Sequence, residues 1–163
     1  MKILVCGGAG FIGSAFIRNY LNNNPKDKII NLDSLTIGSN LKNLKKIEQN
    51  KNYQFIKGDI KNQKVVNDLV RDVDIIINFA AESHVDRSIA NPKPFIETNI
   101  LGTYSLLEAT KKYDSLFIHV STDEVYGDAE NEDSFTEKSI INPSNPYSAT
   151  KASADHLVSA YHR

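Results

Sequence analysis

Tyr147 and Lys151 are the residues of this sequence with the clearest chemical potential, because they lie four positions apart. At that spacing two side chains share one face of a helix. A nearby ammonium group favours the phenolate and lowers the pKa of a tyrosine, so the pair could deprotonate an alcohol or a sugar hydroxyl. Pro146 predicts that a helix begins there, since proline suits the first helical position. The same spacing also occurs by chance, so the interpretation depends on the surrounding sequence.

A run of hydroxyl and carboxylate side chains, Ser121 to Glu124, lies upstream of this pair. It follows an apolar segment that is typical of a buried strand, and open α/β sheets bind ligands at the carboxyl ends of their strands. Ser121 or Thr122 could complete a hydroxyl–tyrosine–lysine arrangement for hydride transfer. Adjacent side chains on an extended backbone point apart, so we expect Asp123 and Glu124 to act as separate acid and base in an elimination of water. The alternative is a solvated acidic turn.

A glycine-rich turn follows the first apolar segment, with Gly7, Gly10 and Gly13 in the spacing G-x-x-G-x-x-G. Its place between a predicted strand and a predicted helix is the one that a dinucleotide fingerprint requires. Glycine there lets the backbone approach a pyrophosphate, and the helix N-terminus offers free N–H groups to the anion. Asp33, 20 residues after Gly13, could accept hydrogen bonds from the adenosine ribose, which favours NAD over NADP. The alternatives are a purely structural glycine turn and a capping aspartate.

Other polar positions carry weaker indications. Asp59 could bind the adenine amine, or it could simply form a turn. Ala80 and Ala81 are small enough for a cofactor to lie across the end of their strand. His84 lacks other histidines or cysteines at metal-ligand spacing, so we expect no metal site. Asn99, in a predicted helix, could be a buried polar link or only a polar residue at a helix contact.

Composition and charge exclude several classes of protein. The 163 residues, a length that suits one domain, carry 19 basic and 20 acidic side chains and a net charge of −1. Nucleic-acid binding without sequence preference needs a basic surplus, so we expect no nucleic-acid partner. No apolar run reaches the roughly 18 residues of a membrane helix, and glycines interrupt the apolar start, against a secretory signal. Cys6 is the only cysteine, which favours a cytoplasmic location.

Short apolar runs alternate with longer helical patterns along the chain. The runs are rich in β-branched residues and nearly continuous, as in strands that are covered on both faces. They predict strands at residues 2–6, 28–33, 53–57, 74–79 and 116–121, and helices at 11–21, 41–48, 63–70, 94–112 and from Pro146 onward. Residues 22–28 and 128–144 are predicted to be loops. The alternation predicts an α/β fold with a doubly wound parallel sheet and right-handed crossovers.

Several stretches together resemble a known family, the extended short-chain dehydrogenase/reductases that act on nucleotide sugars. In chain order they are GGAGFIGS, NFAAESHVDRS, FIETNILGTY, STDEVYG and NPYSATK. They are most similar to the dTDP-glucose 4,6-dehydratase branch of that family, and Thr-Asp-Glu is the most specific part. Epimerases of the family look similar around the glycines and Tyr-x-x-x-Lys but usually lack the Asp-Glu pair. GDP-mannose dehydratases and UDP-glucuronate decarboxylases typically have Ser-Glu there.

The resemblance implies an internal redox reaction with tightly held NAD. Tyr147 would deprotonate the C4 hydroxyl of the sugar while hydride leaves C4, and Lys151 would support Tyr147 and bind the nicotinamide ribose. Glu124 would remove the C5 proton, Asp123 would protonate the departing C6 hydroxyl, and Thr122 would hold the C4 oxygen. Substrate contacts are implied at Ser83 and Thr122. Cofactor contacts are implied at Gly7, Gly10, Phe11, Ile12, Gly13, Asp33, Ser34, Leu35, Thr36, Asp59, Ile60, Phe79, Ala80, Ala81, Ser83, Thr98, Tyr147 and Lys151.

The resemblance also implies a domain organisation and an assembly. Members of the family are longer, so residues 1–163 would form the NAD-binding Rossmann domain, and the C-terminal substrate-binding domain would be absent from this chain. Members pair through the helices that begin near Pro94 and Pro146, which implies a homodimer. Two other functions stay open: a nucleotide-sugar 4-epimerase, and a NAD-binding module without catalysis. The nucleotide base is open too, because UDP-glucose dehydratases have similar motifs.

Overall fold

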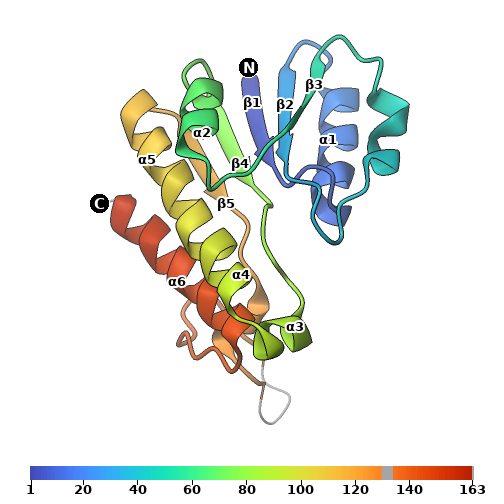
Figure 1. The fold of residues 1–163 in the computed structure, drawn as a ribbon. Helices are drawn as coiled ribbons and strands as arrows, with labels where there is room; N and C mark the ends of the chain where they lie inside the picture. The colour runs from blue at the N-terminus through green and yellow to red at the C-terminus, as the bar shows by residue number, and fades with distance from the viewer. Residues whose placement is uncertain (130–133, 163) are drawn as a thin grey trace.

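One parallel sheet forms the centre of the molecule. The structure, a computed structural model, describes residues 1–129 and 134–162. Five strands lie in the order β3-β2-β1-β4-β5. Their bounds are β1 (Lys2–Cys6), β2 (Lys28–Asp33), β3 (Tyr53–Lys57), β4 (Ile75–Asn78) and β5 (Leu116–His119). The chain builds outward from β1 to β3 and then crosses back to β4, which places a topological switch point beside β1 (Figure 1). The predicted doubly wound α/β fold is confirmed.

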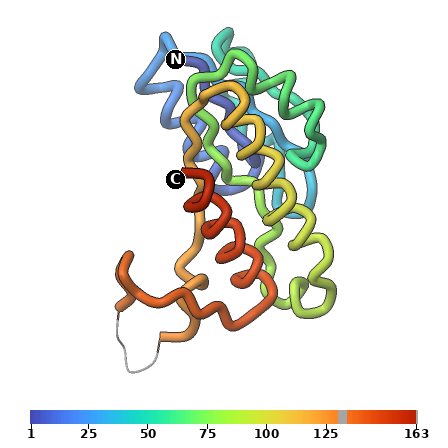
Figure 2. Tube along the Cα trace, turned by 90° about the vertical axis from the view of Figure 1, so that its left-hand side faces the viewer, coloured from blue at the N-terminus to red at the C-terminus, as the bar shows by residue number. Residues whose placement is uncertain are grey.

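Helices cover both faces of this sheet (Figure 1). On one face lie α1 (Phe11–Asn23) and the 3₁₀-helix η1 (Leu41–Ile47). On the other lie α2 (Gln63–Val70) and α5 (Thr103–Tyr113). The remaining helices are α3 (Val85–Ala90), α4 (Lys93–Phe95), the π-helix η2 (Ile96–Gly102), the 3₁₀-helix η3 (Asp123–Tyr126) and α6 (Pro146–Tyr161). Figure 2 shows α6 running alongside α5.

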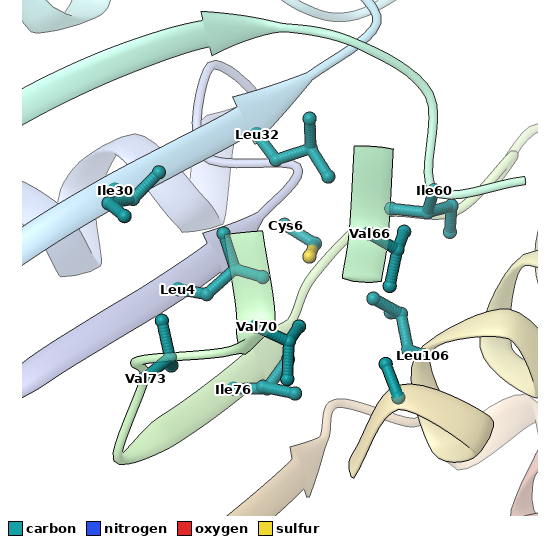
Figure 3. Close-up of a cluster of buried hydrophobic side chains, with 11 residues drawn as sticks. Leu4, Cys6, Ile30, Leu32, Ile60, Val66, Val70, Val73, Ile76 and Leu106 are labelled. Carbon is teal, nitrogen blue, oxygen red and sulfur yellow. The ribbon is translucent and has the colours of Figure 1, made fainter. Parts of the chain in front are cut away.

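The core has two layers, because successive side chains of a strand point to opposite faces of the sheet. Leu4 and Cys6 of β1 pack with residues of α2 and α5, and Figure 3 shows this cluster. Ile3 and Val5, which alternate with them along the strand, pack instead with residues of α1 and η1. Full burial of one such aliphatic side chain contributes about 1.5–3 kcal/mol. The continuous apolar run of β1 thus secures helices on both faces at once.

Several predicted boundaries differ from the structure. β4 and β5 end earlier than predicted, and the turns after them carry site residues. The helix predicted at 94–112 is three consecutive pieces, α4, η2 and α5, and the one predicted at 41–48 is a 3₁₀-helix. α3 was not predicted. The predicted loop at 128–144 contains no helix or strand in its described part, and residues 130–133 lie outside the described residues.

The helix predicted from Pro146 is confirmed, with a clear physical cause for its start. The Asn145 side chain accepts a hydrogen bond from the Ser148 backbone N–H (2.8 Å), and the Asn145 backbone N–H donates one to the Ser148 hydroxyl (3.2 Å). This capping box, with proline at the first helical position, fixes where α6 begins. Among the described residues, no helix has the length and apolar character to cross a membrane.

Candidate active site

A cleft of about 530 Å³ opens along the carboxyl edge of the sheet. Every strand contributes a residue at or just beyond its end: Gly7, Asp33, Gly58, Phe79 and Val120. Because all strands are parallel, residues far apart in the sequence meet at this one edge. The volume is typical of sites that bind small molecules or cofactors.

The residues predicted to contact the cofactor line this cleft, with one exception. They are Gly7, Gly10, Phe11, Ile12, Gly13, Asp33, Ser34, Thr36, Asp59, Ile60, Phe79, Ala80, Ala81, Ser83, Thr98, Tyr147 and Lys151. The exception is Leu35, whose side chain packs against the core on the α1 face of the sheet. Its backbone adopts the left-handed conformation (φ 58°), which is unusual for a leucine. That conformation places the Leu35 N–H 2.8 Å from an oxygen of Asp33.

The glycines of the turn have different reasons for being glycine. A Cβ on Gly7 would lie 2.6 Å from the Ala80 nitrogen, and one on Gly13 would lie 2.5 Å from the Gly7 oxygen. Packing of the protein itself therefore requires glycine at both positions, as the structural alternative for this turn predicts. A Cβ on Gly10 would meet only the Gly7 oxygen, at 3.3 Å. Unlike Gly7 and Gly13, Gly10 therefore faces a space that other atoms of the protein leave largely open.

The N-terminus of α1 begins directly at Gly10. It has no side-chain cap and no acidic residue in its first turn. The Phe11 side chain is 87% exposed, although aromatic side chains are usually buried. Free N–H groups and a helix dipole at the mouth of a cleft are suited to an anion such as a pyrophosphate. The residues present therefore fit a dinucleotide.

Asp33 is already engaged by the protein. One oxygen accepts from the Ala9 N–H (2.8 Å), and the other accepts from the Leu35 N–H (2.8 Å) and the Ser39 hydroxyl (2.9 Å). A carboxylate offers about four acceptor positions, so one remains for a ribose hydroxyl. The residue, 5% exposed, ties the glycine turn to the end of β2. These contacts show the structural role that was the alternative, and the contact with a ribose stays a prediction.

Tyr147 and Lys151 lie on the buried side of α6, as their spacing predicts, and both line the cleft. Burial raises the pKa of Tyr147, a hydrogen bond with Thr122 lowers it, and the charges of Glu124 and Asp123 raise it. The predicted lowering by Lys151 is not observed. Instead the Lys151 amine, in a residue only 3% exposed, donates to the Val120 carbonyl (2.6 Å) and lies 3.2 Å from the Nε2 atom of His119.

Asp123 and Glu124 lie on the 3₁₀-helix η3, and not on the extended backbone that was predicted. Their carboxylates nevertheless differ in environment. Glu124 is half-buried and accepts a hydrogen bond from the side-chain amide of Asn145 (3.2 Å), the cap of α6. Asp123 is exposed and accepts from the Thr122 hydroxyl (3.3 Å). The two acids are therefore held separately beside the start of the helix that carries Tyr147.

Two polar residues join the segment after β4 to α6. Asn99, buried in the π-helix η2, bonds both backbone groups of Glu82 (2.9 and 3.0 Å) and donates to the Thr150 hydroxyl (2.9 Å). The prediction of a buried polar link is confirmed. Ser88, which the sequence did not single out, accepts from the Tyr147 N–H (3.1 Å). These contacts fix Tyr147 relative to the cleft.

The remaining candidates lie at the margins. His84 is exposed, and the described residues contain no group of three side chains that could hold a metal. Ser83 lines the cleft. The lining also includes Ile37, Ser39 and Lys61, which sequence reasoning missed because they lie in the irregular segments after β2 and β3.

Acid is expected to destabilise the chain through His119. Burial and the Lys151 charge lower the pKa of this histidine to about 3, so between pH 6.5 and 3 the unfolded chain binds a proton that the folded chain excludes. The free energy of unfolding should therefore fall with decreasing pH by up to about 1.4 kcal/mol per pH unit from this group alone. Urea unfolding at several pH values measures the slope. His119→Gln should reduce it, whereas the exposed His162→Gln should not; equal slopes in both variants would contradict the assignment.

The strand order and the cleft at the carboxyl edge define an α/β domain of the Rossmann type. The protein family described as GDP-mannose 4,6 dehydratase matches residues 4–163, and the chain belongs to this family.

Individual relatives point to one branch of that family. The chain is 48% identical to a dTDP-glucose 4,6-dehydratase of Escherichia coli, over all of this chain and 51% of the relative. It is 51% identical to the low-salt glycan biosynthesis protein Agl12 of Haloferax volcanii, over 99% and 52% of the two. The crystal structure of DesIV, a dTDP-glucose 4,6-dehydratase of Streptomyces venezuelae with NAD bound, matches all of the chain and 52% of DesIV (TM-score 0.95, 46% identity). The chain thus spans about half the length of these relatives.

Proposed function

We propose that residues 1–163 form the NAD-binding and catalytic domain of a nucleotide-sugar dehydratase. The reaction converts a nucleoside-diphosphate glucose, with dTDP-glucose as the first candidate, to its 4-keto-6-deoxy product with loss of water. The dehydratase relatives and the Asp-Glu pair support this choice over a 4-epimerase.

The cleft supports NAD as the cofactor. The space at Gly10 and the free N–H groups of α1 suit the pyrophosphate, and Asp33 suits the adenosine ribose. Asp59 and Ile60 line the cleft beyond β3, where the adenine would lie. Tyr147 and Lys151 would contact the nicotinamide ribose. When bound, NAD would accept hydride from C4 of the sugar and return it at C6.

The side chains of the chain supply the proton transfers. Tyr147 removes the proton of the C4 hydroxyl, and Thr122 holds the C4 oxygen by a hydrogen bond. The resulting ketone acidifies the C5 proton, which Glu124 removes. Asp123 gives a proton to the C6 hydroxyl, which leaves as water. Ser83, at the cleft wall, contacts the substrate.

One observation carries the proposal: a separately held acid pair lies beside the tyrosine that begins the reaction. The Glu124 carboxylate bonds the cap of α6, and Tyr147 is the second residue of that helix. Oxidation at C4 needs only the tyrosine. Removal of water across C5 and C6 also needs a base and an acid, and η3 supplies both side chains.

Incubation with NAD and a panel of dTDP-, UDP-, GDP- and CDP-hexoses tests the proposal by mass spectrometry. We expect one member to lose the mass of one water, which would also name the nucleotide. An isomerised sugar of unchanged mass would identify an epimerase instead. NAD binding without any sugar chemistry, in this chain and in a longer protein containing it, would identify a cofactor-binding module.

The assembly that we propose is a homodimer through the helices that begin near Pro94 and Pro146. Exposed apolar side chains on this side of the molecule support it: Ile96 and Leu101 of η2 and Tyr104 of α5. Sedimentation equilibrium should give twice the monomer mass, and Leu101→Arg should return the monomer because a charge would be buried at the contact. A monomeric mass for both the unmodified chain and the variant would contradict the proposal.

We also propose a cytoplasmic location, which would fit the use of NAD.

A further inference from the structure

Three side chains near the Lys151 amine have no part in the proposed reaction: His119, Asp155 and Ser121. We propose that His119 and Asp155 are a positioning pair for Lys151: the Val120 carbonyl holds the amine at the end of β5, and the two side chains favour opposite charge states on it. The functional meaning rests on the proposed role of Lys151 beside Tyr147. The contacts themselves are a property of the folded chain.

The orientation of His119 follows from its other neighbour, Asn78. The side-chain oxygen of Asn78 accepts from the Ala80 N–H (3.1 Å), which directs its amide nitrogen toward the Nδ1 atom of His119 (3.3 Å). Nδ1 is therefore the acceptor, and the neutral imidazole carries its hydrogen on Nε2. Nε2 lies 3.2 Å from the Lys151 amine. A donor that faces this amine disfavours the ammonium form.

Asp155 acts in the opposite direction. It lies one turn beyond Lys151 on α6, and its charge favours the ammonium form. One oxygen accepts from the Ser121 hydroxyl (2.5 Å), and the other lies 3.7 Å from the His119 Nε2 atom. Ser121 thus fixes the carboxylate against the end of β5, where Val120 binds the amine.

The other charged groups act mainly on the neighbours of Lys151. Asp123 and Glu124 of η3 raise the pKa of Tyr147, and His156 of α6 lowers that of Asp155. Glu82, from the segment after β4, lines the same cleft. Burial lowers the pKa of Lys151 to about 8, and Asp155 opposes that shift. The pKa of the Lys151 amine therefore lies close to neutral pH, so a modest interaction can change the fraction of the amine that is protonated.

Carbon-13 NMR of the chain, labelled at the lysine Cε atoms, tests the pair without sugar or NAD. Lys151→Arg identifies the resonance. We expect Lys151 to titrate near pH 8, well below the roughly 10.4 of exposed lysines. Asp155→Asn, which retains an acceptor for Ser121, should lower this midpoint by about half a pH unit or more. The control Ser121→Ala removes the hydrogen bond and keeps the charge, so the midpoint should stay nearly unchanged.

Nitrogen-15 NMR of labelled histidine tests the other half of the pair. Above the Lys151 midpoint, where the neutral amine can accept a hydrogen bond, we expect a bare Nδ1 and a protonated Nε2 on His119. The reverse tautomer, a charged imidazolium, or an Asp155→Asn midpoint equal to that of the unmodified chain would overturn the proposal. Neither titration involves substrate. The titrations can therefore refute the positioning pair while the chain still dehydrates sugar, and they can support the pair even if the chain does not.

Discussion

Glu124→Gln is expected to stop the loss of water while C4 of the sugar is still oxidised. Glutamine retains the size of the side chain and an oxygen that can accept from Asn145, but it cannot take the C5 proton. General base catalysis contributes about 10²–10⁴-fold, so dehydration should slow by that factor. Mass spectrometry measures water loss, and the absorbance of reduced cofactor measures oxidation at C4. Both measurements are made on the form of the protein that converts the sugar, which is either this chain or a longer protein containing it.

The same substitution should change the pH dependence of the oxidation step. The Glu124 charge raises the pKa of Tyr147, so its removal lowers that pKa. Oxidation at C4, which needs the tyrosine to lose its proton, should then persist to lower pH. The exposed Glu137→Gln serves as the control and should change neither step. Equal loss of oxidation and dehydration in Glu124→Gln would contradict the role assigned to Glu124.

Gly10→Ala is expected to weaken NAD binding by about 100-fold or more. The added methyl group would occupy the space where we place the pyrophosphate, and each charge-assisted hydrogen bond lost there is worth about 1.5–3 kcal/mol. The backbone of Gly10 is extended (φ −71°), so alanine fits it without strain. Calorimetric titration with NAD measures the affinity.

Gly13→Ala provides the contrast. Its methyl group would clash with the Gly7 carbonyl at 2.5 Å, so this variant should lose folding stability. Gly10→Ala should stay within about 1 kcal/mol of the unmodified chain, because loss of chain entropy in the unfolded state offsets mild crowding. Unchanged NAD affinity in a folded Gly10→Ala chain would refute the placement of the pyrophosphate.

Much of the fold could be predicted because its signals are local. The apolar runs of β1, β2 and β3 match their predicted bounds, and Asn145 and Pro146 mark the start of α6 within four residues of sequence. The break of the helix at 94–112 could not be predicted. The π-helical piece contains Asn99, whose partners Glu82 and Thr150 lie in segments far from it in the chain, and such contacts leave no local pattern in the sequence.

The site residues also divide into those that a local sequence pattern identifies and those that come together only in the folded chain. The glycine turn and the Tyr-x-x-x-Lys spacing are local patterns, and their residues do meet in the cleft. His119 and Asp155 are 36 residues apart and meet only because β5 and α6 pack together. The Tyr147 pKa was mispredicted for a related reason: spacing places Lys151 on the same face, but the Val120 carbonyl and His119 decide where its amine points.

Isotope tracing tests the central claim most directly. The nucleotide sugar that loses water in the panel, labelled with deuterium at C4, is incubated with NAD, and the position of the label in the product is read by NMR. We predict that the product has lost one water and carries the deuterium at C6, since hydride leaves C4 and returns at C6. Deuterium that remains at C4 without loss of water, or that exchanges into solvent, would contradict the account.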